Sequence, residues 1–215
     1  MDNPNKQKLF ELLDQHPEWQ VLDLGGWEQP LMRADWVVDI RDFDAPGNQG
    51  VIGDGQRRRN GRSRWVQMDM CGHKLPFNDK AFDFVFCSNV LEDLRDPLWL
   101  CAEIQRVGKV GYIEVPRVGQ ELTGGVDCRN GQYLGYWHHR WIVKPQVDAR
   151  GHLELWFLPK FSMVNMKSWP VKDSQRGFEP IYWKDQIYTH EILTENSEQY
   201  YKVINDFLGV IDGCT

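Results

Sequence analysis

The chain has 215 residues, of which 41% are hydrophobic and 26% are charged, which is ordinary for a globular protein with one full core. Its net charge of -6 argues against a protein built as a whole to hold nucleic acid. No apolar run approaches the roughly 18 residues of a membrane span, and residues 1–8 lack a signal-peptide core. The five cysteines form no Cys-x-x-Cys pair, which favours reduced thiols in a cytoplasmic protein.

A buried strand that breaks into a glycine turn is predicted at residues 19–26, after a first helix over residues 5–16. The run Val21-Leu22-Asp23-Leu24 is typical of a parallel strand that is buried on both faces. Ligands of open α/β sheets bind beyond the carboxyl ends of such strands, where Gly25 and Gly26 would let the backbone come close. An ordinary strand-to-turn junction is the alternative.

Acidic residues end the next strands as well. We expect strands at residues 34–40, 65–69, 82–87 and 110–115. Asp39 lies 16 positions after Asp23, close to the spacing at which an acid binds ribose hydroxyls in dinucleotide-binding folds. Asp69 ends the third strand. The segment between the first two strands is short and contains Pro30, so its linking helix can have only a turn or two.

A helix is predicted between the fourth and fifth strands, with Asp96 as its N-cap and Pro97 at its first position. Its buried face would be Leu100, Ile104 and Val107, and Gly108 would end it. Strands that alternate with helices predict an α/β fold with a doubly wound, mostly parallel Rossmann-like sheet.

The rest of the chain is expected to elaborate this sheet within a single domain of residues 1–215, whose core spans about residues 17–116. Residues 41–64 contain many glycines and few apolar positions, which predicts a mobile surface loop. Residues 117–215 would form an acceptor-side elaboration. In it we expect an antiparallel hairpin of residues 141–147 and 152–158, and a closing helix within residues 191–211.

The segments VLDLGG, VVD (37–39), QMD (67–69), LPFNDKAFDFVFCSNVLEDLRDP (75–97) and EIQRVGKVGYIEVP (103–116) give the chain a family resemblance. It resembles the class I S-adenosylmethionine-dependent methyltransferases, in particular their small methyltransferase-domain group. The resemblance implies a transferase with S-adenosylmethionine as its cofactor. The cofactor-binding residues that it implies are Asp23, Gly25, Gly26, Asp39, Asp69, Met70, Ser88 and Asn89.

The resemblance also implies a role for each of these residues. Asp69 would lie near the adenine amino group, with the backbone of Met70 at the ring edge, and Asp39 would bind the ribose. Asp23 and the glycine turn would lie beside the methionine portion. Ser88 and Asn89 would face the reactive methyl. Carboxylates suit this ligand because it offers a diol, an amine and two cationic groups that they can bind. The alternative is that these acids only cap the helices that follow the strands.

Two positions depart from the family pattern. Trp27 stands where the family's glycine turn usually has its last glycine, so that it would either block the cofactor or act as a lid. Asp93 stands where the family often has a histidine after the fourth strand. A binding domain that has lost its catalytic activity is therefore an alternative.

Methyl transfer to an oxygen needs a general base as well as alignment of the reacting atoms. The candidates are Glu92, Asp93, His138 and His139, of which His139 is preferred. The two histidines lie in residues 133–141, a segment that we expect to wall the acceptor pocket, although its tryptophans could instead form the core face of the hairpin. We expect no metal site, because Cys71 and His73 lack partners at ligand spacing.

The leading interpretation is a cytoplasmic methyltransferase that acts on a small-molecule or glycan-linked acceptor. A nucleic-acid methyltransferase that uses the arginine-rich loop is a second hypothesis, against which the acidic net charge argues. A solvated loop is the simpler explanation of those arginines, which are Arg57, Arg58, Arg59, Arg62 and Arg64.

Overall fold

The computed structural model describes residues 4–27, 29–45, 64–127, 133–161 and 169–209. The chain divides into two compact units, and each is described by itself. Unit 1 comprises Met1–Leu91, Asp96–Glu114 and Pro180–Ile187. Unit 2 comprises Glu92–Arg95, Val115–Glu179 and Tyr188–Thr215.

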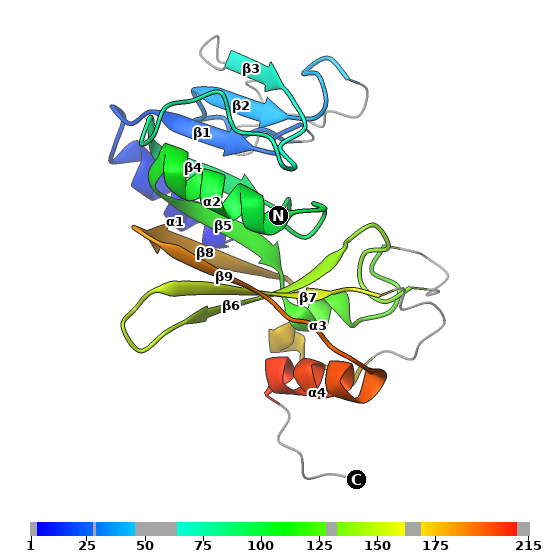
Figure 1. Ribbon diagram of the computed structural model, residues 1–215. Coiled ribbons are helices and arrows are strands. Elements are labelled where there is room, and N and C mark those ends of the chain that lie inside the picture. The colour runs from blue at the N-terminus through cyan, green and yellow to red at the C-terminus, as the bar shows by residue number, and fades with distance from the viewer. Residues whose placement is uncertain (1–3, 28, 46–63, 128–132, 162–168, 210–215) are drawn as a thin grey trace. The chain divides into compact units, whose positions relative to one another are not determined.

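Unit 1 is built on a six-stranded sheet whose strand order is β3-β2-β1-β4-β5-β8 (Figure 1). Strands β1 to β5 pair with one another in the parallel direction. The helices and strands of this unit are α1 (Pro4–Asp14), β1 (Val21–Leu24), β2 (Trp36–Asp39), β3 (Arg64–Gln67), β4 (Phe82–Ser88), α2 (Pro97–Val107), β5 (Gly108–Pro116) and β8 (Phe178–Lys184). The predicted α/β fold with a mostly parallel, Rossmann-like sheet is confirmed.

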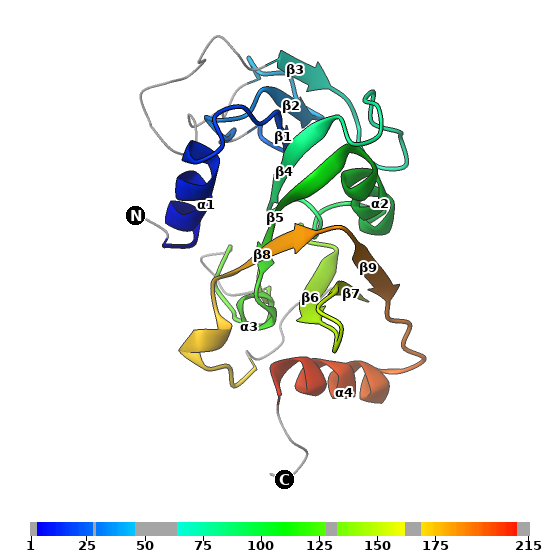
Figure 2. The same ribbon diagram turned by 90° about the vertical axis from the view of Figure 1, so that its left-hand side faces the viewer.

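The central strands are apolar because both faces of the sheet are covered. Helices α1 and α2 lie on opposite faces of it (Figure 2). Leu9 and Leu13 of α1 form a buried cluster with Val21, Phe84 and other side chains of one face. Alternate residues of the same strands point the other way, so that all of β1 and the middle of β4, residues 84–87, are buried.

Helix α2 begins and ends where the sequence predicts. The side chain of Asp96 accepts a hydrogen bond from the backbone N–H of Trp99, and Pro97 occupies the first helical position. The predicted buried face of Leu100, Ile104 and Val107 is fully buried. Gly108 follows the helix and is also the first residue of β5, so the chain reverses without a loop.

The strand order reverses at β1, which pairs in the parallel direction with β2 on one side and with β4 on the other. In doubly wound sheets the ligand crevice opens at such a switch point, beyond the carboxyl ends of the strands. The residues that follow β1 and β4 are the glycine turn and Asn89. The fold of unit 1 therefore directs attention to this edge.

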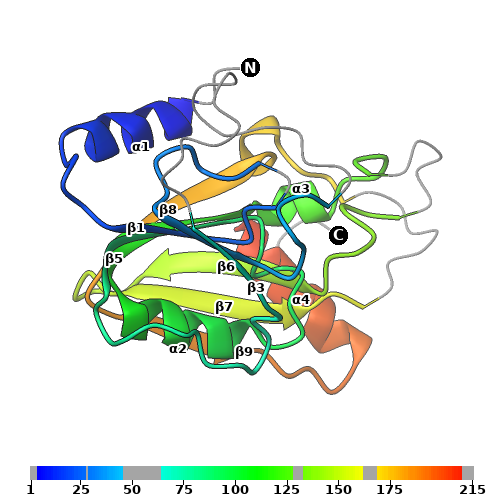
Figure 3. The same cartoon turned by 90° about the horizontal axis from the view of Figure 1, so that it is seen from above.

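Unit 2 contains a three-stranded sheet of order β6-β7-β9. The predicted hairpin is confirmed: β6 and β7 are antiparallel and lie side by side (Figure 3), joined by a turn with Gly151 at φ 85°. Helix α4 begins after the N-cap Asn196 and ends at Gly209 in the left-handed region. The elements of this unit are α3 (Val118–Glu121), β6 (Trp141–Val147), β7 (Leu153–Pro159), the 3-10 helix η1 (Asp173–Gln175), β9 (Ile187–Glu191) and α4 (Ser197–Leu208).

The structure differs from the sequence-based expectation in three places. Residues 25–27 and 29–35 form turns, so the short linking helix predicted between the first two strands was wrong. The sequence analysis did not anticipate β8 or β9, although β8 extends the main sheet. Of the predicted loop at 41–64, Arg64 begins β3 and residues 46–63, with the other arginines, lie outside the described residues. None of the helices among the described residues is long and apolar enough to cross a membrane.

Candidate functional site

The glycine turn after β1 is folded tightly against side chains of its own unit. Gly25 adopts φ 78°, and its backbone N–H donates to the carbonyl of Val38 at 2.8 Å. A Cβ at Gly25 would collide with the side chain of Val90, and one at Gly26 would collide with the carboxylate of Asp23. Both positions therefore require glycine to close the turn, whatever else binds there.

Asp23 is a buried carboxylate with one atom left unsatisfied. Its side chain lies inside unit 1, with 1% of the residue exposed. Oδ2 accepts a hydrogen bond from the N–H of Leu31 at 2.7 Å, whereas Oδ1 is buried without a hydrogen-bond partner among the residues that the structure describes. Burial, with a smaller contribution from the nearby charge of Asp39, raises the pKa of Asp23 to about 7. A buried acceptor of this kind suits a ligand that donates to it.

Asp39 holds the backbone of the glycine turn. Its Oδ2 accepts from the N–H of Trp27 at 3.0 Å, and Oδ1 accepts from the N–H of Arg41 at 2.8 Å. The guanidinium of Arg41 lies 4.3 Å from the ring centroid of Trp27, a cation–π contact that keeps the indole over the turn. Burial raises the pKa of Asp39 despite these hydrogen bonds. Trp27 thus fills the last-glycine position with its N–H bound to Asp39.

The backbone continues the parallel ladder past the strand ends and brings the three acids to one edge. The N–H of Gly25 donates to Val38, and the N–H of Met68 donates to the carbonyl of Asp39 at 2.8 Å. Asp69 follows Met68 and is exposed, with its Oδ1 accepting from Cys71 at 2.8 Å. Carboxylates at one sheet edge can together bind hydroxyl, amine and cationic groups.

The remaining cofactor residues predicted from the sequence also lie in unit 1. Met70 is buried, directly after Asp69. The hydroxyl of Ser88 donates to Oε1 of Glu114 at 2.9 Å, at the end of β4. Asn89 is exposed and adopts φ 55°, a conformation that asparagine tolerates better than most residues.

The candidate bases lie in unit 2, where His139 is held by a buried carboxylate. His139 Nδ1 lies 2.6 Å from Oε1 of Glu121, and Nζ of Lys160 donates to Oε2 of Glu121 at 2.6 Å. Lys160 also donates to the carbonyl of Tyr136 at 2.7 Å. Both Glu121 and His139 are buried. A carboxylate on Nδ1 fixes the ring and its tautomer and leaves Nε2 to accept a proton or a ligand.

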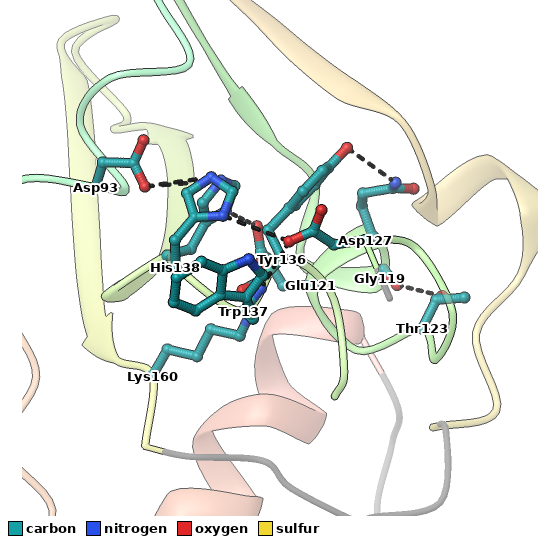
Figure 4. Close-up of polar contacts among 11 residues, drawn as sticks. Asp93, Gly119, Glu121, Thr123, Asp127, Tyr136, Trp137, His138 and Lys160 are labelled. Atoms are coloured by element: carbon teal, nitrogen blue, oxygen red, sulfur yellow. Dashed lines mark hydrogen bonds and ion pairs between the residues drawn. The ribbon is translucent and has the colours of Figure 1, made fainter. Parts of the chain in front are cut away.

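Asp93 and His138 stand on the other side of His139. Oδ1 of Asp93 lies 3.8 Å from Nε2 of His138 and 3.9 Å from Nε2 of His139. Figure 4 shows Asp93 facing the ring of His138, with Asp127 near the ring's other nitrogen at 3.5 Å. Burial raises the pKa of Asp93, although the two histidines act in the opposite direction.

The two histidines lie at a turn and not in an extended segment. Residues 137 and 138 form a turn, and the rings of His138 and His139 meet edge to face at 4.6 Å. Their Nε2 atoms consequently approach the same oxygen of Asp93. Of the two, His138 is exposed, whereas His139 is only 8% exposed.

The other residues of the predicted acceptor segment divide between surface and interior. Trp137 is 65% exposed, whereas Trp141 is partly buried and its indole N–H donates to the carbonyl of Leu94 at 2.8 Å. Glu92 is fully buried, and its backbone carbonyl accepts from the N–H of Arg140 at 2.7 Å. Its burial makes Glu92 a poor base for an acceptor that arrives from solvent.

Unit 2 also contains a cavity of about 480 Å³. Its described lining comes from the segment after β5, from β6, from the region of η1 and from the end of α4, and includes no residue of 133–141. Arg117 and Glu179 in the lining form an ion pair at 2.7 Å, so the wall carries both signs of charge. The cavity and the histidine cluster are separate features of this unit.

The sequence analysis did not find Glu121, Lys160 or Asp127. The spacing of these residues along the chain carries no motif, because they come from α3, from the end of β7 and from the segment before the histidines. The packing of Glu121 against Gly135, where a Cβ would meet the carboxylate at 2.5 Å, is visible only in three dimensions.

Comparison with known proteins gives a family match and several similar folds. Residues 48–113 match the model of a family described as methyltransferase domain. No curated protein is similar enough to the chain to count as a relative. The match begins after the glycine turn and Asp39 and includes Asp69, Met70, Ser88 and Asn89.

Among solved structures, the [4+2]-cyclase SpnF is 18% identical with a TM-score of 0.37, over 51% of this chain and 44% of that one. A SAM-dependent methyltransferase from Aquifex aeolicus is 17% identical with a TM-score of 0.34, over 55% of this chain and 75% of that one. The N-terminal domain of EvdMO1 with SAH bound is 14% identical with a TM-score of 0.37, over 96% of this chain and 71% of that one. The chain thus spans less than half the length of SpnF.

An open, mostly parallel sheet with acids at its strand tips defines a Rossmann-like protein of the kind that binds nucleotide cofactors. Because the TM-scores are all low, the family assignment rests on the match over residues 48–113. The match, which covers less than a third of the chain, supports a class I S-adenosylmethionine-dependent methyltransferase with S-adenosylmethionine as its cofactor.

The residues of unit 1 fit this cofactor in one specific respect. Within the described part of the chain, Oδ1 of Asp23 is a buried acceptor without a hydrogen-bond partner, at the strand edge where Asp39 and Asp69 also lie. The cofactor's amino group and sulfonium are cations that a carboxylate would stabilise. Trp27 closes the turn as a glycine would, with its backbone N–H directed to Asp39.

Proposed function

We propose that this methyltransferase acts on a small-molecule or glycan-linked acceptor in the cytoplasm. The observation that carries the proposal is the methyltransferase-domain match over residues 48–113, which includes the third acid and the end of β4. The aromatic and histidine-rich residues 133–141 support the class of acceptor, because aromatic faces pack on sugar-like rings while histidines bind hydroxyls. Cys71 and Cys101 are buried and form no disulfide, which is in keeping with a reducing compartment.

In this proposal the residues of unit 1 hold the cofactor. Asp39 would bind the ribose diol, Asp69 the adenine amine, and Asp23 the methionine portion. Gly25 and Gly26 would keep the turn close to the ligand, with Met70, Ser88 and Asn89 completing the site. When bound, S-adenosylmethionine supplies a methyl group that is open to in-line displacement.

His139 of unit 2 is the base that we propose for an oxygen acceptor. Glu121 on Nδ1 orients the imidazole, and Nε2 remains to take the acceptor's proton. Asp93, 3.9 Å from Nε2, would stabilise the imidazolium that results. Glu92, the third catalytic candidate, would contribute through position only, since its carbonyl fixes Arg140 before β6.

Methyl transfer from radiolabelled S-adenosylmethionine tests this function. The purified chain is incubated with panels of nucleotide sugars, free glycans, phenols, RNA and duplex DNA, and labelled product is counted. Label on a sugar or small molecule supports the proposal, and label on nucleic acid alone overturns it. With an active acceptor, His139→Ala should lower turnover at least tenfold and leave cofactor affinity nearly unchanged, because a general base contributes about 10²–10⁴ in rate.

A binding domain without turnover is the second candidate, favoured by Trp27 at the last-glycine position. The cation–π contact of Arg41 with the indole, at 4.3 Å, supports this candidate because it favours one position of the ring. Trp27→Gly decides between the two candidates in the same assay. A gain in turnover with the variant would show that the tryptophan restricts catalysis in the natural sequence, whereas unchanged turnover in an active protein would exclude the second candidate.

A further inference from the structure

Three side chains of unit 2 present potential metal ligands to one point. They are Asp93, His138 and His139, and one ligand atom of each lies within 4.8 Å of the others. The closest approaches are those of Oδ1 of Asp93 to the two Nε2 atoms, at 3.8 and 3.9 Å. Two ligands bound at about 2.1 Å and at right or tetrahedral angles would be about 3.0–3.4 Å apart. The two distances from Asp93 therefore need to shorten by less than about 1 Å, and the longest separation in the cluster, within 4.8 Å, by up to about 1.8 Å, for the cluster to enclose an ion.

The surroundings of the three ligands match those of a metal site. Metal-binding histidines nearly always donate the other ring N–H to a carboxylate or carbonyl. Nδ1 of His139 lies 2.6 Å from Glu121, and Nδ1 of His138 lies 3.5 Å from Asp127. Each imidazole thus has a carboxylate behind it and its Nε2 directed at the common point.

The carboxylate of Glu121, which binds His139, is itself held in place by buried contacts. Glu121 is 1% exposed, and its second oxygen binds Lys160, which also donates to the carbonyl of Tyr136. With the ring locked in this way, Nε2 is the nitrogen that remains for a ligand.

The environment of Oδ1 of Asp93 also favours a bound cation. This oxygen is buried and has no hydrogen-bond partner among the described residues, although it faces both histidines. A buried acceptor without a hydrogen bond is unfavourable unless a cation or donor satisfies it. A metal ion at the common point would satisfy this oxygen and both Nε2 atoms at once.

We propose that Asp93, His138 and His139 bind a divalent transition-metal ion, with zinc or ferrous iron as the class that two imidazoles and one carboxylate favour. Three protein ligands leave coordination positions open to solvent or to an acceptor hydroxyl. In the metal-bound protein Nε2 of His139 is a ligand, so its role as a base belongs to the metal-free protein. Metal binding itself does not depend on the proposed function.

Metal titration of the purified, untagged full chain tests the proposal. After chelator treatment and dialysis, Co²⁺ is added as a spectroscopic probe and Zn²⁺ binding is measured by calorimetry. We expect one ion per chain, with a ligand-field absorption band for Co²⁺. Asp93→Asn and His138→Ala should weaken Zn²⁺ binding at least a hundredfold, and Glu121→Gln should weaken it about 10- to 100-fold.

His152→Ala is the matched control, because His152 also forms a histidine–carboxylate pair, with Asp148 at 3.1 Å, but has no third ligand beside it among the described residues. It should bind Zn²⁺ as the natural chain does. Absence of stoichiometric binding at micromolar Zn²⁺, or equal binding by Asp93→Asn and the natural chain, would overturn the proposal. Circular dichroism verifies that each variant is folded, and the isosteric Asp93→Asn keeps the test decisive if a histidine variant unfolds. Metal binding without methyl transfer would contradict the proposed function alone.

Discussion

At the scale of single residues, Asp23 couples the stability of unit 1 to pH. Its carboxyl has a pKa of about 7 in the folded protein, against an ordinary value of 3.8, because it is buried. Between these two values the folded state binds a proton that the unfolded state lacks, so stability falls as pH rises from about 4 to about 7. Above about pH 7 the carboxyl is ionised in both the folded and the unfolded state, so its contribution to the stability no longer changes with pH.

We therefore predict that Asp23→Asn stabilises the protein relative to the natural chain by roughly 2–3 kcal/mol more at pH 8 than at pH 5. Urea unfolding of both proteins at the two pH values measures this. Asp83→Asn is the matched control. Although burial acts to raise it, Lys109 and the N–H of Gln20 hold the pKa of Asp83 below its usual value, so its substitution should have the same effect at both pH values. An equal effect of Asp23→Asn at pH 5 and pH 8 would contradict the account.

Lys160 and Lys109 make ion pairs of nearly equal length in very different surroundings. Nζ of Lys160 lies 2.6 Å from Glu121 with 5% of its side chain exposed, and Nζ of Lys109 lies 2.7 Å from Asp83 with 57% exposed. Lys160→Met should cost about 3 kcal/mol of unfolding free energy, because it leaves a buried carboxylate with a histidine alone. Lys109→Met should cost under about 1 kcal/mol. Chemical denaturation of the two variants measures both losses of unfolding free energy. Equal losses would show that burial does not determine how much each ion pair stabilises the protein.

The sequence indicates the acids of unit 1 better than the partners of His139. Asp23 and Asp39 end apolar strands, a local pattern that can be read from consecutive residues. Glu121 reaches His139 only because α3 packs beside Gly135, and Asp93 meets the histidines because residues 137 and 138 turn. Such contacts depend on tertiary packing, and the motif-based expectation of no metal site could not take account of them.

At the scale of elements, the N-cap of α2 can be tested directly. Asp96 accepts from the N–H of Trp99 at 3.0 Å, so Asp96→Ala should lower the free energy of unfolding by about 1 kcal/mol. Asp96→Asn should retain most of the stability, because its amide oxygen can accept the same bond. Thermal unfolding of the two variants beside the natural chain measures the difference. Equal stability of the two variants would argue against the cap.

Helix α2 was predictable because its cap, its apolar spacing and its terminating glycine agree with one another. Strands β8 and β9 were not, since their residues lack regular alternation and β8 is stabilised by its place beside β5. The pairing of β8 with β5 depends on close packing, since a Cβ at Gly111 of β5 would meet the ring of Trp183 at 2.7 Å. The prediction of a linking helix between β1 and β2 was wrong because a tertiary contact fixes turns there: the N–H of Leu31 donates to the carboxylate of Asp23.

At the scale of the whole molecule, the chain distributes its chemistry over two units. The acids proposed for the cofactor belong to unit 1, and the histidine cluster proposed for the acceptor and the metal belongs to unit 2. The net charge of -6 is in keeping with an acceptor other than nucleic acid. The family match lies in unit 1 except for Glu92–Arg95, so a function of the rest of unit 2 must be established by its own measurements.

Binding of S-adenosylhomocysteine, measured by isothermal calorimetry, tests the central claim most directly. We predict one site per chain, which Asp39→Ala weakens at least tenfold because hydrogen bonds to a charged group contribute about 1.5–3 kcal/mol. Asp69→Ala should weaken binding as well. Asp42→Ala, an exposed acid of the same region, should bind as the natural chain does. No detectable heat with the natural chain, or equal affinity of Asp39→Ala and Asp42→Ala, would contradict the account.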